Sequence, residues 1–390
     1  MEAEDAGIRR RREEGAPVLR PGEDCPGPRL SQGIRGGGQG QAGPALGRPA
    51  AGPAWRQHRS EEIARVPGDV PAVDGRRDEA IVMKEFFERL NRIGRPARPD
   101  LTEKDYRLHV LLGGIARDDF LRDGLLFKGG TCLLKAYLGY YRFSEDLDFT
   151  WGDPAVRDLS SRSAAARRCS GLIDEISVRL VRLAGGCGLG FSGRKRDPRE
   201  VRIGSGGRMA TFFLRYPSEM LGGEGVLKVE VNFIEKLLFG PGTRRLRTYV
   251  EAVDAGELRF LYRDLWNGYS AAVDFPCYDL REIFVEKARA AITRRGFNTR
   301  DLMDLHFIQR GAGLSLGRYR KAIIEKTGFA LDLYRRYREN IRLERVPSDA
   351  GLAAGAEKLL LGPVPEDLSR EMGKIQRRLD RIRDDISAGR

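Results

Sequence analysis

The stretch Phe127–Phe149 reads FKGGTCLLKAYLGYYRFSEDLDF, and its first part is an apolar strand that runs into Gly129 and Gly130 and then into a predicted helix over residues 131–140. Backbone N–H groups at the start of such a helix have no intrahelical partner and carry the positive end of the helix dipole, which attracts phosphate. The stretch therefore predicts a phosphate-binding turn, in which the Thr131 hydroxyl donates one more hydrogen bond. A tight turn with Thr131 as a helix cap is the alternative interpretation.

The second part of the stretch is a predicted strand over residues 145–151 in which acidic and apolar side chains alternate. Asp146 and Asp148 lie on one face of this strand, and Leu147 and Phe149 lie on the other. Two carboxylates held side by side repel each other unless a cation lies between them. Mg²⁺ suits that position because it takes one or two carboxylates and completes its shell with substrate phosphates. Asp146 and Asp148 are therefore predicted metal ligands, and an exposed strand with two solvated acids is the alternative.

The composition indicates a globular chain with a basic surface and one long segment that cannot fold by itself. The 390 residues include 69 Lys and Arg against 56 Asp and Glu, and the formal charge of +13 favours a polyanionic partner without identifying it. Residues 1–78 are rich in Gly, Pro, Arg and Ala, so they bury too little apolar surface to offset their ordering entropy and are predicted to be disordered. A basic arm for nucleic acid, or a true start of the chain at Met83, are alternatives for this segment.

Several classes of site and location are disfavoured by the sequence. The five cysteines are odd in number and form no CxxC pair, which favours reduced thiols in a cytoplasm. A signal-peptide pattern and an apolar run of about 18 residues are both absent from the sequence, so no membrane partner is expected. With only three histidines, a zinc site built from histidine is not expected. The chain is therefore predicted to be cytoplasmic.

The rest of the pattern predicts helices around a sheet, and Thr102 is the predicted N-cap of the second helix. Helices are predicted over residues 79–93, 102–120 and 164–183, and from Leu280 almost to the C-terminus. Strands are predicted over residues 124–128 and 227–234, and in a hairpin over residues 200–216. The turn of that hairpin, Gly204–Gly207, is followed by no helix and is not expected to bind a nucleotide.

The glycine pair, the connecting helix and the paired aspartates together resemble the AbiEii/AbiGii toxins, a group of DNA polymerase β-like nucleotidyltransferases from type IV toxin–antitoxin and abortive-infection systems. The resemblance covers about residues 105–310 and is carried by Gly129-Gly130-Thr131 and Asp146-Leu147-Asp148. It implies an α+β fold, in which a polymerase β-like nucleotidyltransferase core with a mixed sheet flanked by helices precedes a mostly helical C-terminal part. The expected domains are the core with its N-terminal helices over 79–275 and a helical domain over 276–390.

The resemblance also implies the remaining site residues. The family's KxD motif matches Lys228-Val229-Glu230, with Glu in place of Asp, so Glu230 is the expected third carboxylate and metal ligand. The family's helical lysine matches Lys287, which would neutralise charge on the triphosphate. The RDLYDL motif matches residues 300–305, where Asp301 and Asp304 lie one helical turn apart and are both expected to face the cleft. The nucleotide-binding residues implied by the resemblance are Lys128, Gly129, Gly130, Thr131 and Lys228.

Each of these assignments has a structural alternative. Glu230 can be an outward-facing acid on an alternating strand, and Glu282, Glu286 and Lys287 can form a solvated helical stripe. Asp301 can complement the dipole of a helix that Asn298 or Thr299 caps. The basic segment 318–338, with its three tyrosines, is expected to be a solvated helix face with aromatic anchors in the core, and contact with RNA is the alternative. The apolar four-three spacing over residues 368–386 predicts a helix that docks against a neighbour.

The function implied by the resemblance is transfer of a nucleotide from an NTP to an RNA, with the 3′ end of tRNA as the expected acceptor, Mg²⁺ or Mn²⁺ as the cofactor and a cognate antitoxin as a partner. The residues leave two other functions open. One is transfer of a nucleotide or phosphate to a protein side chain, and the other is a catalytically inactive module that binds nucleotide or RNA.

Overall fold

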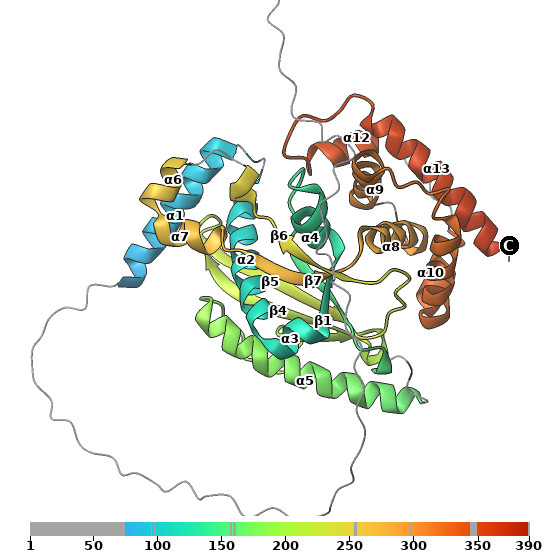
Figure 1. Ribbon diagram of the computed structural model, residues 1–390, viewed down its shortest axis with the longest axis horizontal. Coiled ribbons are helices and arrows are strands. Elements are labelled where there is room, and N and C mark those ends of the chain that lie inside the picture. Colours follow the sequence, from blue (N-terminus) through green and yellow to red (C-terminus); the bar gives the residue numbers. More distant parts are fainter. Residues whose placement is uncertain are drawn as a thin grey trace, which may run out of the picture. The chain divides into compact units, whose positions relative to one another are not determined.

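The computed structural model describes residues 75–94, 96, 98–156, 158, 161–252, 256–296, 298–343 and 349–388. Of the tail predicted to be disordered, residues 1–74 lie outside the described residues, and residues 75–78 belong to helix α1, Gly75–Gly94. The described part contains a mixed sheet with helices around it, followed by helices alone (Figure 1). The predicted α+β class is confirmed.

Within the described residues, seven strands form one sheet in the order β3-β4-β5-β2-β1-β7-β6. The strands are β1 Leu125–Lys128, β2 Asp146–Trp151, β3 Val201–Gly204, β4 Met209–Ser218, β5 Gly223–Asn232, β6 Gly242–Leu246 and β7 Val273–Cys277. The pairs β2–β5 and β1–β7 are parallel and the others are antiparallel. The predicted hairpin is β3–β4, whereas β6 and β7 were not expected from the sequence.

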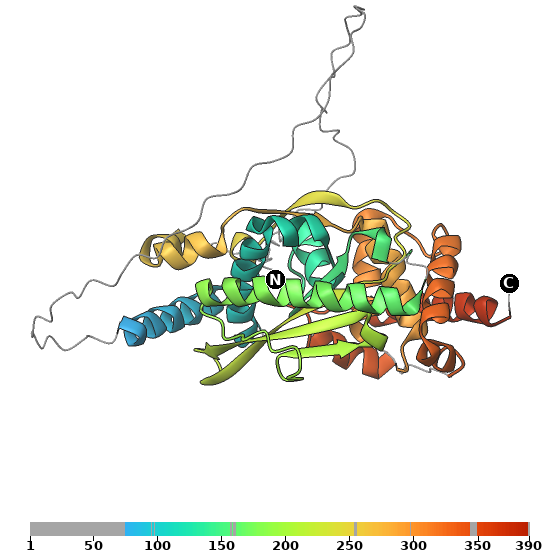
Figure 2. The ribbon, with the colours of Figure 1, turned by 90° about the horizontal axis from the view of Figure 1, so that it is seen from below.

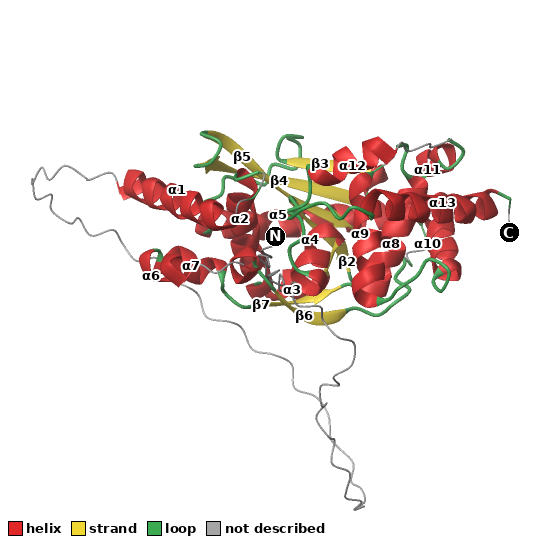
Figure 3. Cartoon of the chain, turned by 90° about the horizontal axis from the view of Figure 1, so that it is seen from above, coloured by secondary structure: helices red, strands yellow, loops and turns green. Residues whose placement is uncertain are grey.

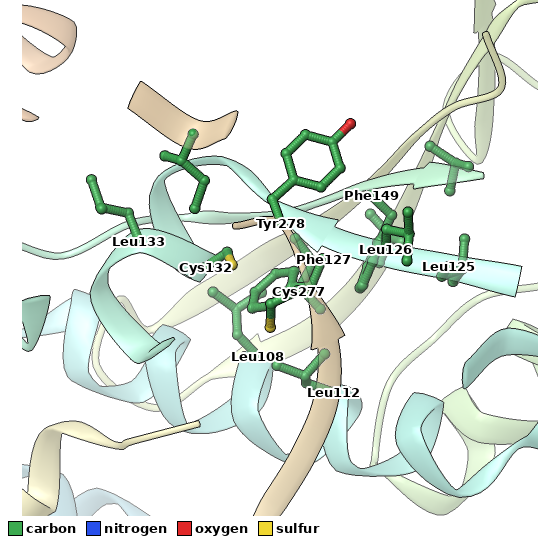
Figure 4. Packing of buried hydrophobic residues seen from close by; sticks show 14 of the residues in the cluster. Leu108, Leu112, Leu125, Leu126, Phe127, Cys132, Leu133, Phe149, Cys277 and Tyr278 are labelled. Carbon is green, nitrogen blue, oxygen red and sulfur yellow. The ribbon is translucent and has the colours of Figure 1, made fainter. Parts of the chain in front are cut away.

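Further helices lie before and within the sheet segment, and several of them pack on the sheet. They are α2 Asp100–Arg117, α3 Asp119–Gly124, α4 Gly129–Leu133, α5 Arg162–Gly186, α6 Gly256–Leu261 and α7 Arg263–Tyr269. Helices α2 and α5 pack against each other and against the strands (Figure 2). Leu108 and Leu112 of α2 lie beside Phe127 and Cys277 of the sheet (Figure 4), and all four side chains are fully buried. This apolar layer lies on the strand faces opposite to the alternating acids.

The start and the end of α2 differ from the prediction. The helix begins at Asp100, and Thr102 lies inside its first turn, where its hydroxyl is 2.6 Å from the carbonyl oxygen of Pro99. Thr102 as N-cap was therefore wrong, because the hydroxyl bonds back to the chain before the helix. The predicted helix over 102–120 is broken at Asp118, whose extended backbone ends α2 and whose carboxylate accepts the N–H of Leu121 to start α3.

The C-terminal helices pack together beside the sheet (Figure 3). They are α8 Leu280–Thr293, α9 Thr299–Ala312, α10 Arg320–Leu333, α11 Arg335–Asn340, α12 Asp349–Glu357 and α13 Leu368–Ser387. Helix α13 buries Leu368, Met372 and Leu379 against α8, α9 and α12, so the predicted docking helix is confirmed. Strand β7 spans the expected domain division at residue 275, which stays a prediction. Among the described helices, none combines the length and the apolar character that a membrane crossing needs.

Candidate active site

A cavity lies where the glycine turn after β1 meets strands β2 and β5 and helix α8. Its volume of about 240 Å³ is well above the ~30 Å³ share of one water molecule, so it has room for a ligand. The predicted site residues that line this cavity are Lys128, Gly129, Gly130, Asp148, Glu230, Lys287 and Asp301. The predicted site residues outside its lining are Thr131, Asp146, Lys228 and Asp304.

Strands β2 and β5 place three carboxylates next to one another. The two strands run parallel, with Asp148 paired in register with Glu230, and Asp146 with Lys228. Burial, followed by the charges of Glu230 and Asp146, raises the pKa of Asp148 to about 7, although two nearby lysines oppose the shift. Asp148 is therefore not a solvated acid on an exposed strand, and its carboxylate belongs to a crowded anionic group.

This carboxylate group fits a hard divalent cation. The Oδ1 atom of Asp146 is buried and has no hydrogen-bond partner, and the Nζ atom of Lys228 lies 3.7 Å from it. An unpartnered buried carboxylate oxygen is costly, and a cation would remove that cost together with the repulsion among the three acids. In the described ranges, no group of three or more His, Cys, Asp or Glu side chains is placed to hold a metal ion, so these carboxylates as they lie would supply one or two ligands and the substrate would supply others. Mg²⁺ commonly takes one or two carboxylates and completes its shell with phosphate and water.

The glycine turn lies against these carboxylates. Gly129 has a φ of +76°, and a Cβ atom added to it would lie 2.9 Å from both Cβ and Cγ of Asp148. A Cβ atom on Gly130 would lie 2.7 Å from Nη2 of Arg142 and 2.9 Å from Oγ of Ser144. Position 129 therefore requires glycine, a side chain at position 130 would have to displace Arg142 or Ser144, and the turn that begins α4 is on the same side of the sheet as Asp148.

The hydroxyl of Thr131 has a different role from the one expected. It donates to the backbone carbonyl of Asp146 at 2.5 Å, and the Thr131 side chain is buried. Because this hydrogen bond joins the first turn of α4 to the start of β2, Thr131 positions the aspartate strand, and its hydroxyl is not available to a phosphate in this arrangement. The helix that follows also changes type, because residues Leu134–Leu138 continue α4 as a π-helix.

Lys287 is held by the two aspartates of α9. Its Nζ atom lies 3.2 Å from Oδ1 of Asp301 and 2.8 Å from Oδ2 of Asp304. Burial lowers the pKa of Lys287, but Asp304 and Asp301 outweigh that effect and raise it, so the ammonium stays charged. Asn298 caps α9 by accepting the N–H of Arg300, which leaves the Asp301 carboxylate free to pair with Lys287. The solvated-stripe alternative was wrong, since the Lys287 side chain is 14% exposed.

Asp304 is fully enclosed. Arg142 binds it through Nε at 2.9 Å and through Nη2 at 2.8 Å, and the Tyr141 hydroxyl donates to it at 2.6 Å. Burial raises the pKa of Asp304, but Arg142 and Lys287 reverse this and hold it well below its usual range. Asp304 thus joins α9, Lys287 and the segment that precedes β2, a position that suits an orienting role.

Lys128 pairs with a residue that the sequence did not assign to the site. Its Nζ atom lies 2.8 Å from Oε1 of Glu286, and both side chains line the cavity. Burial lowers the pKa of Lys128, but Glu286 and Glu235 outweigh it, so the pKa is raised. The sequence assigned neither Glu286 nor Arg142 to the site. Their only sequence signal is adjacency to motifs that it did assign, because Glu286 directly precedes Lys287 and Arg142 begins the RFSEDLDF segment.

Comparison with known proteins identifies the family. A family model described as nucleotidyl transferase AbiEii toxin of type IV toxin–antitoxin systems matches residues 110–385. No curated protein matches the sequence. Two solved structures from Helicobacter pylori are each similar at 16% sequence identity over 74% of this chain. One is JHP933, with a TM-score of 0.36 and 95% of its own chain covered. The other is a candidate nucleotidyltransferase, with a TM-score of 0.34 and 96% of its own chain covered. At these TM-scores the two structures indicate nothing about activity. The family match covers more than half of the chain, which therefore belongs to the AbiEii family of nucleotidyl transferase toxins, known from type IV toxin–antitoxin systems.

Proposed function

We propose that this protein is a metal-dependent nucleotidyltransferase that moves a nucleotide from an NTP onto an RNA, with the 3′ end of tRNA as the acceptor. The observation that carries the proposal is that the glycine turn, Asp148, Glu230 and Lys287 line one cavity. Membership of the AbiEii family supports nucleotidyl transfer as the class of reaction. The formal charge of +13 supports a polyanionic acceptor.

The residues of the cavity divide the work of binding. Asp148 and Glu230 in the lining, together with Asp146 beside them on β2, would supply the carboxylate ligands of Mg²⁺ or Mn²⁺, which would neutralise charge on the phosphate oxygens. Gly129 and Gly130 line the cavity without side chains, so their backbone would be able to approach a phosphate closely. The Lys287 ammonium, oriented by the aspartates of α9, presents positive charge to the triphosphate.

The proposed reaction is an in-line displacement at the α-phosphorus of the NTP. The oxygen of an acceptor hydroxyl forms the new P–O bond, the bond to the β-phosphate oxygen breaks, pyrophosphate leaves and the hydroxyl proton passes to water. A modified tRNA 3′ end would no longer accept an amino acid, which accounts for toxicity. A cognate antitoxin is the partner that family membership implies, and the cytoplasm is the proposed compartment because NTPs and tRNA occur there.

A transfer assay tests the proposal. Purified protein is incubated with each labelled NTP in turn and with total tRNA or a protein mixture, with and without EDTA. We expect tRNA to become labelled with at least one of the NTPs, and we expect EDTA to abolish this labelling. Asp146→Ala combined with Asp148→Ala is expected to abolish labelling, whereas Asp332→Asn, at a side chain that is 85% exposed, is the matched control and keeps it. Label on protein alone, or equal labelling by the double variant, contradicts the proposal.

A further inference from the structure

One end of the cavity is built by residues that no motif assigns to a ligand. Tyr334 lies between α10 and α11, Arg336 and Tyr337 belong to α11, and all three line the same cavity as Asp148 and Glu230. Helix α10 adds apolar lining beside them, through Phe329, Ala330 and Leu333. The segment expected to be a solvated helix face therefore contributes aromatic and apolar surface to the site.

The aromatic side chains form a compact platform with one guanidinium. The ring centroids of Tyr334 and Tyr337 are 5.2 Å apart with the planes at 71°, and Cζ of Arg336 lies 5.8 Å and 5.0 Å from the two centroids. The other cations of the lining have carboxylate partners: Lys128 and Arg289 pair with Glu286, and Lys287 and Arg294 pair with Asp301. Among the described residues, no carboxylate lies within ion-pair distance of Arg336.

A continuous wall connects this platform to the carboxylate end. Lys128 at the glycine turn pairs with Glu286, whose Oε1 atom accepts from Nη2 of Arg289 at 3.3 Å. Cζ of Arg289 lies 5.9 Å from the ring centroid of Tyr337. The tyrosines and the carboxylates on β2 and β5 therefore belong to one continuous site.

The β3–β4 turn closes the platform end. Ser205 of this turn lines the cavity. Its φ is 54°, and in the described part of the chain it is the one non-glycine residue with a positive φ. Gly206 and Gly207, which follow it, also have positive φ values. Nη1 of Arg208 donates to the carbonyl of Leu333 at 3.3 Å and fastens this turn to the end of α10. Of the Gly204–Gly207 turn, only Ser205 lines the cavity, and the expectation that this turn does not bind a nucleotide stays a prediction. A strained residue held by its surroundings at a cavity wall is typical of ligand-binding sites.

The two ends of the cavity match the two ends of a nucleotide. The carboxylate, glycine and lysine end suits a metal-bound triphosphate, while a flat base stacks on the face of one tyrosine and against a guanidinium, and the second ring, at 71° to the first, meets the edge of the base. We propose that Tyr334, Arg336 and Tyr337 form the subsite for the base of the NTP. This inference rests on the proposed function, and it adds the residues that bind the base.

Calorimetric titration with two ligands tests the subsite. The ligands are an NTP and inorganic triphosphate, both with Mg²⁺ and without an acceptor, so that the nucleoside, base and ribose together, is the difference between them. Tyr334→Ala and Tyr337→Ala are each expected to weaken NTP binding about 5- to 100-fold, the usual effect of losing one stacked ring, and to leave triphosphate binding unchanged. Tyr334→Phe and Tyr337→Phe keep the ring and are expected to restore NTP binding. Arg335→Ala is the matched control, because this neighbouring side chain is 92% exposed and lies outside the lining.

The outcomes separate this inference from the proposed function. If the unaltered protein binds neither ligand, the proposed function fails and the subsite fails with it. If it binds both ligands and the alanine variants bind NTP as well as the unaltered protein does, the base subsite alone is wrong. Equal loss of both ligands in variants that keep the wild-type melting temperature also overturns the subsite, because it places the tyrosines against the phosphates.

Discussion

Replacement of Asp148 by Asn tests whether the carboxylates on β2 and β5 are crowded and desolvated. Free energy of unfolding changes with pH in proportion to the difference in bound protons between the unfolded and folded states. The pKa of Asp148 is about 7 in the folded protein, against 3.8 for an ordinary aspartate. Between these values the unfolded chain has lost this proton and the folded protein keeps it, so this residue makes the free energy of unfolding fall as pH rises. Asparagine cannot ionise, so the variant lacks this fall.

The magnitude follows from the size of the shift. Each pKa unit corresponds to ~1.36 kcal/mol, so a shift of about 3 units gives a ceiling of about 4 kcal/mol. The expected change is smaller than this ceiling, because part of the titration lies below the accessible pH range and water reaches the cavity. Between about pH 4.5 and about pH 8, the free energy of unfolding of Asp148→Asn should rise by about 2 to 3 kcal/mol relative to that of the wild type. Titrating groups far from Asp148 affect both proteins equally and cancel in the difference.

Urea unfolding of both proteins in EDTA at several pH values measures this difference. Asp332→Asn is the control, because it makes the same chemical change at a side chain that is 85% exposed. Added Mg²⁺ at the higher pH is expected to stabilise the wild type and not Asp148→Asn, since a ligand that binds the folded state raises its stability. A difference between variant and wild type that stays constant with pH would refute the crowded-carboxylate interpretation.

Two further substitutions probe the supports of the site. Gly129→Ala is expected to lower the free energy of unfolding by about 1 to 3 kcal/mol and to abolish tRNA labelling, because the new Cβ atom strains a left-handed backbone and displaces Asp148. Gly171→Ala, within α5 and with open space around it, is the control and should be neutral or stabilising. A similar result at both glycines would show that the Cβ atom at position 129 does not clash with Asp148. Asp304→Asn is expected to lower the free energy of unfolding by about 3 to 5 kcal/mol, because it leaves Arg142 and Lys287 buried without a charged partner of full strength. A loss below about 1 kcal/mol in urea unfolding would show that this ion-pair network does not stabilise the fold.

The local pattern of the sequence determined the elements that carry the site. Alternation of acidic and apolar residues in 145–151 and 227–234 predicted β2 and β5 and placed Asp148 and Glu230 on polar faces, because successive side chains on a strand point to opposite sides. The glycine pair before a helix predicted the turn that lies against Asp148. These features depend on neighbours within a few residues, which a sequence displays directly.

Helix boundaries were less well determined. Thr102 was expected to cap α2, yet its hydroxyl bonds to Pro99 and the helix begins earlier. Thr131 was expected to face a phosphate, yet it donates to the carbonyl of Asp146. In both cases a short polar side chain has several acceptors within reach, and only the path of the chain decides which one it takes.

Only the tertiary structure decided which distant residues share the cavity. Arg142 meets Asp304, Glu286 meets Lys128, and Tyr334 and Tyr337 line the same cavity as the carboxylates of the sheet. These contacts join segments far apart in the chain, and they depend on how helices pack on a sheet rather than on local periodicity. The sequence thus determined the strand, the turn and the acidic pair, whereas the folded chain alone determined which side chains surround them, because contacts between distant segments have no fixed spacing in sequence.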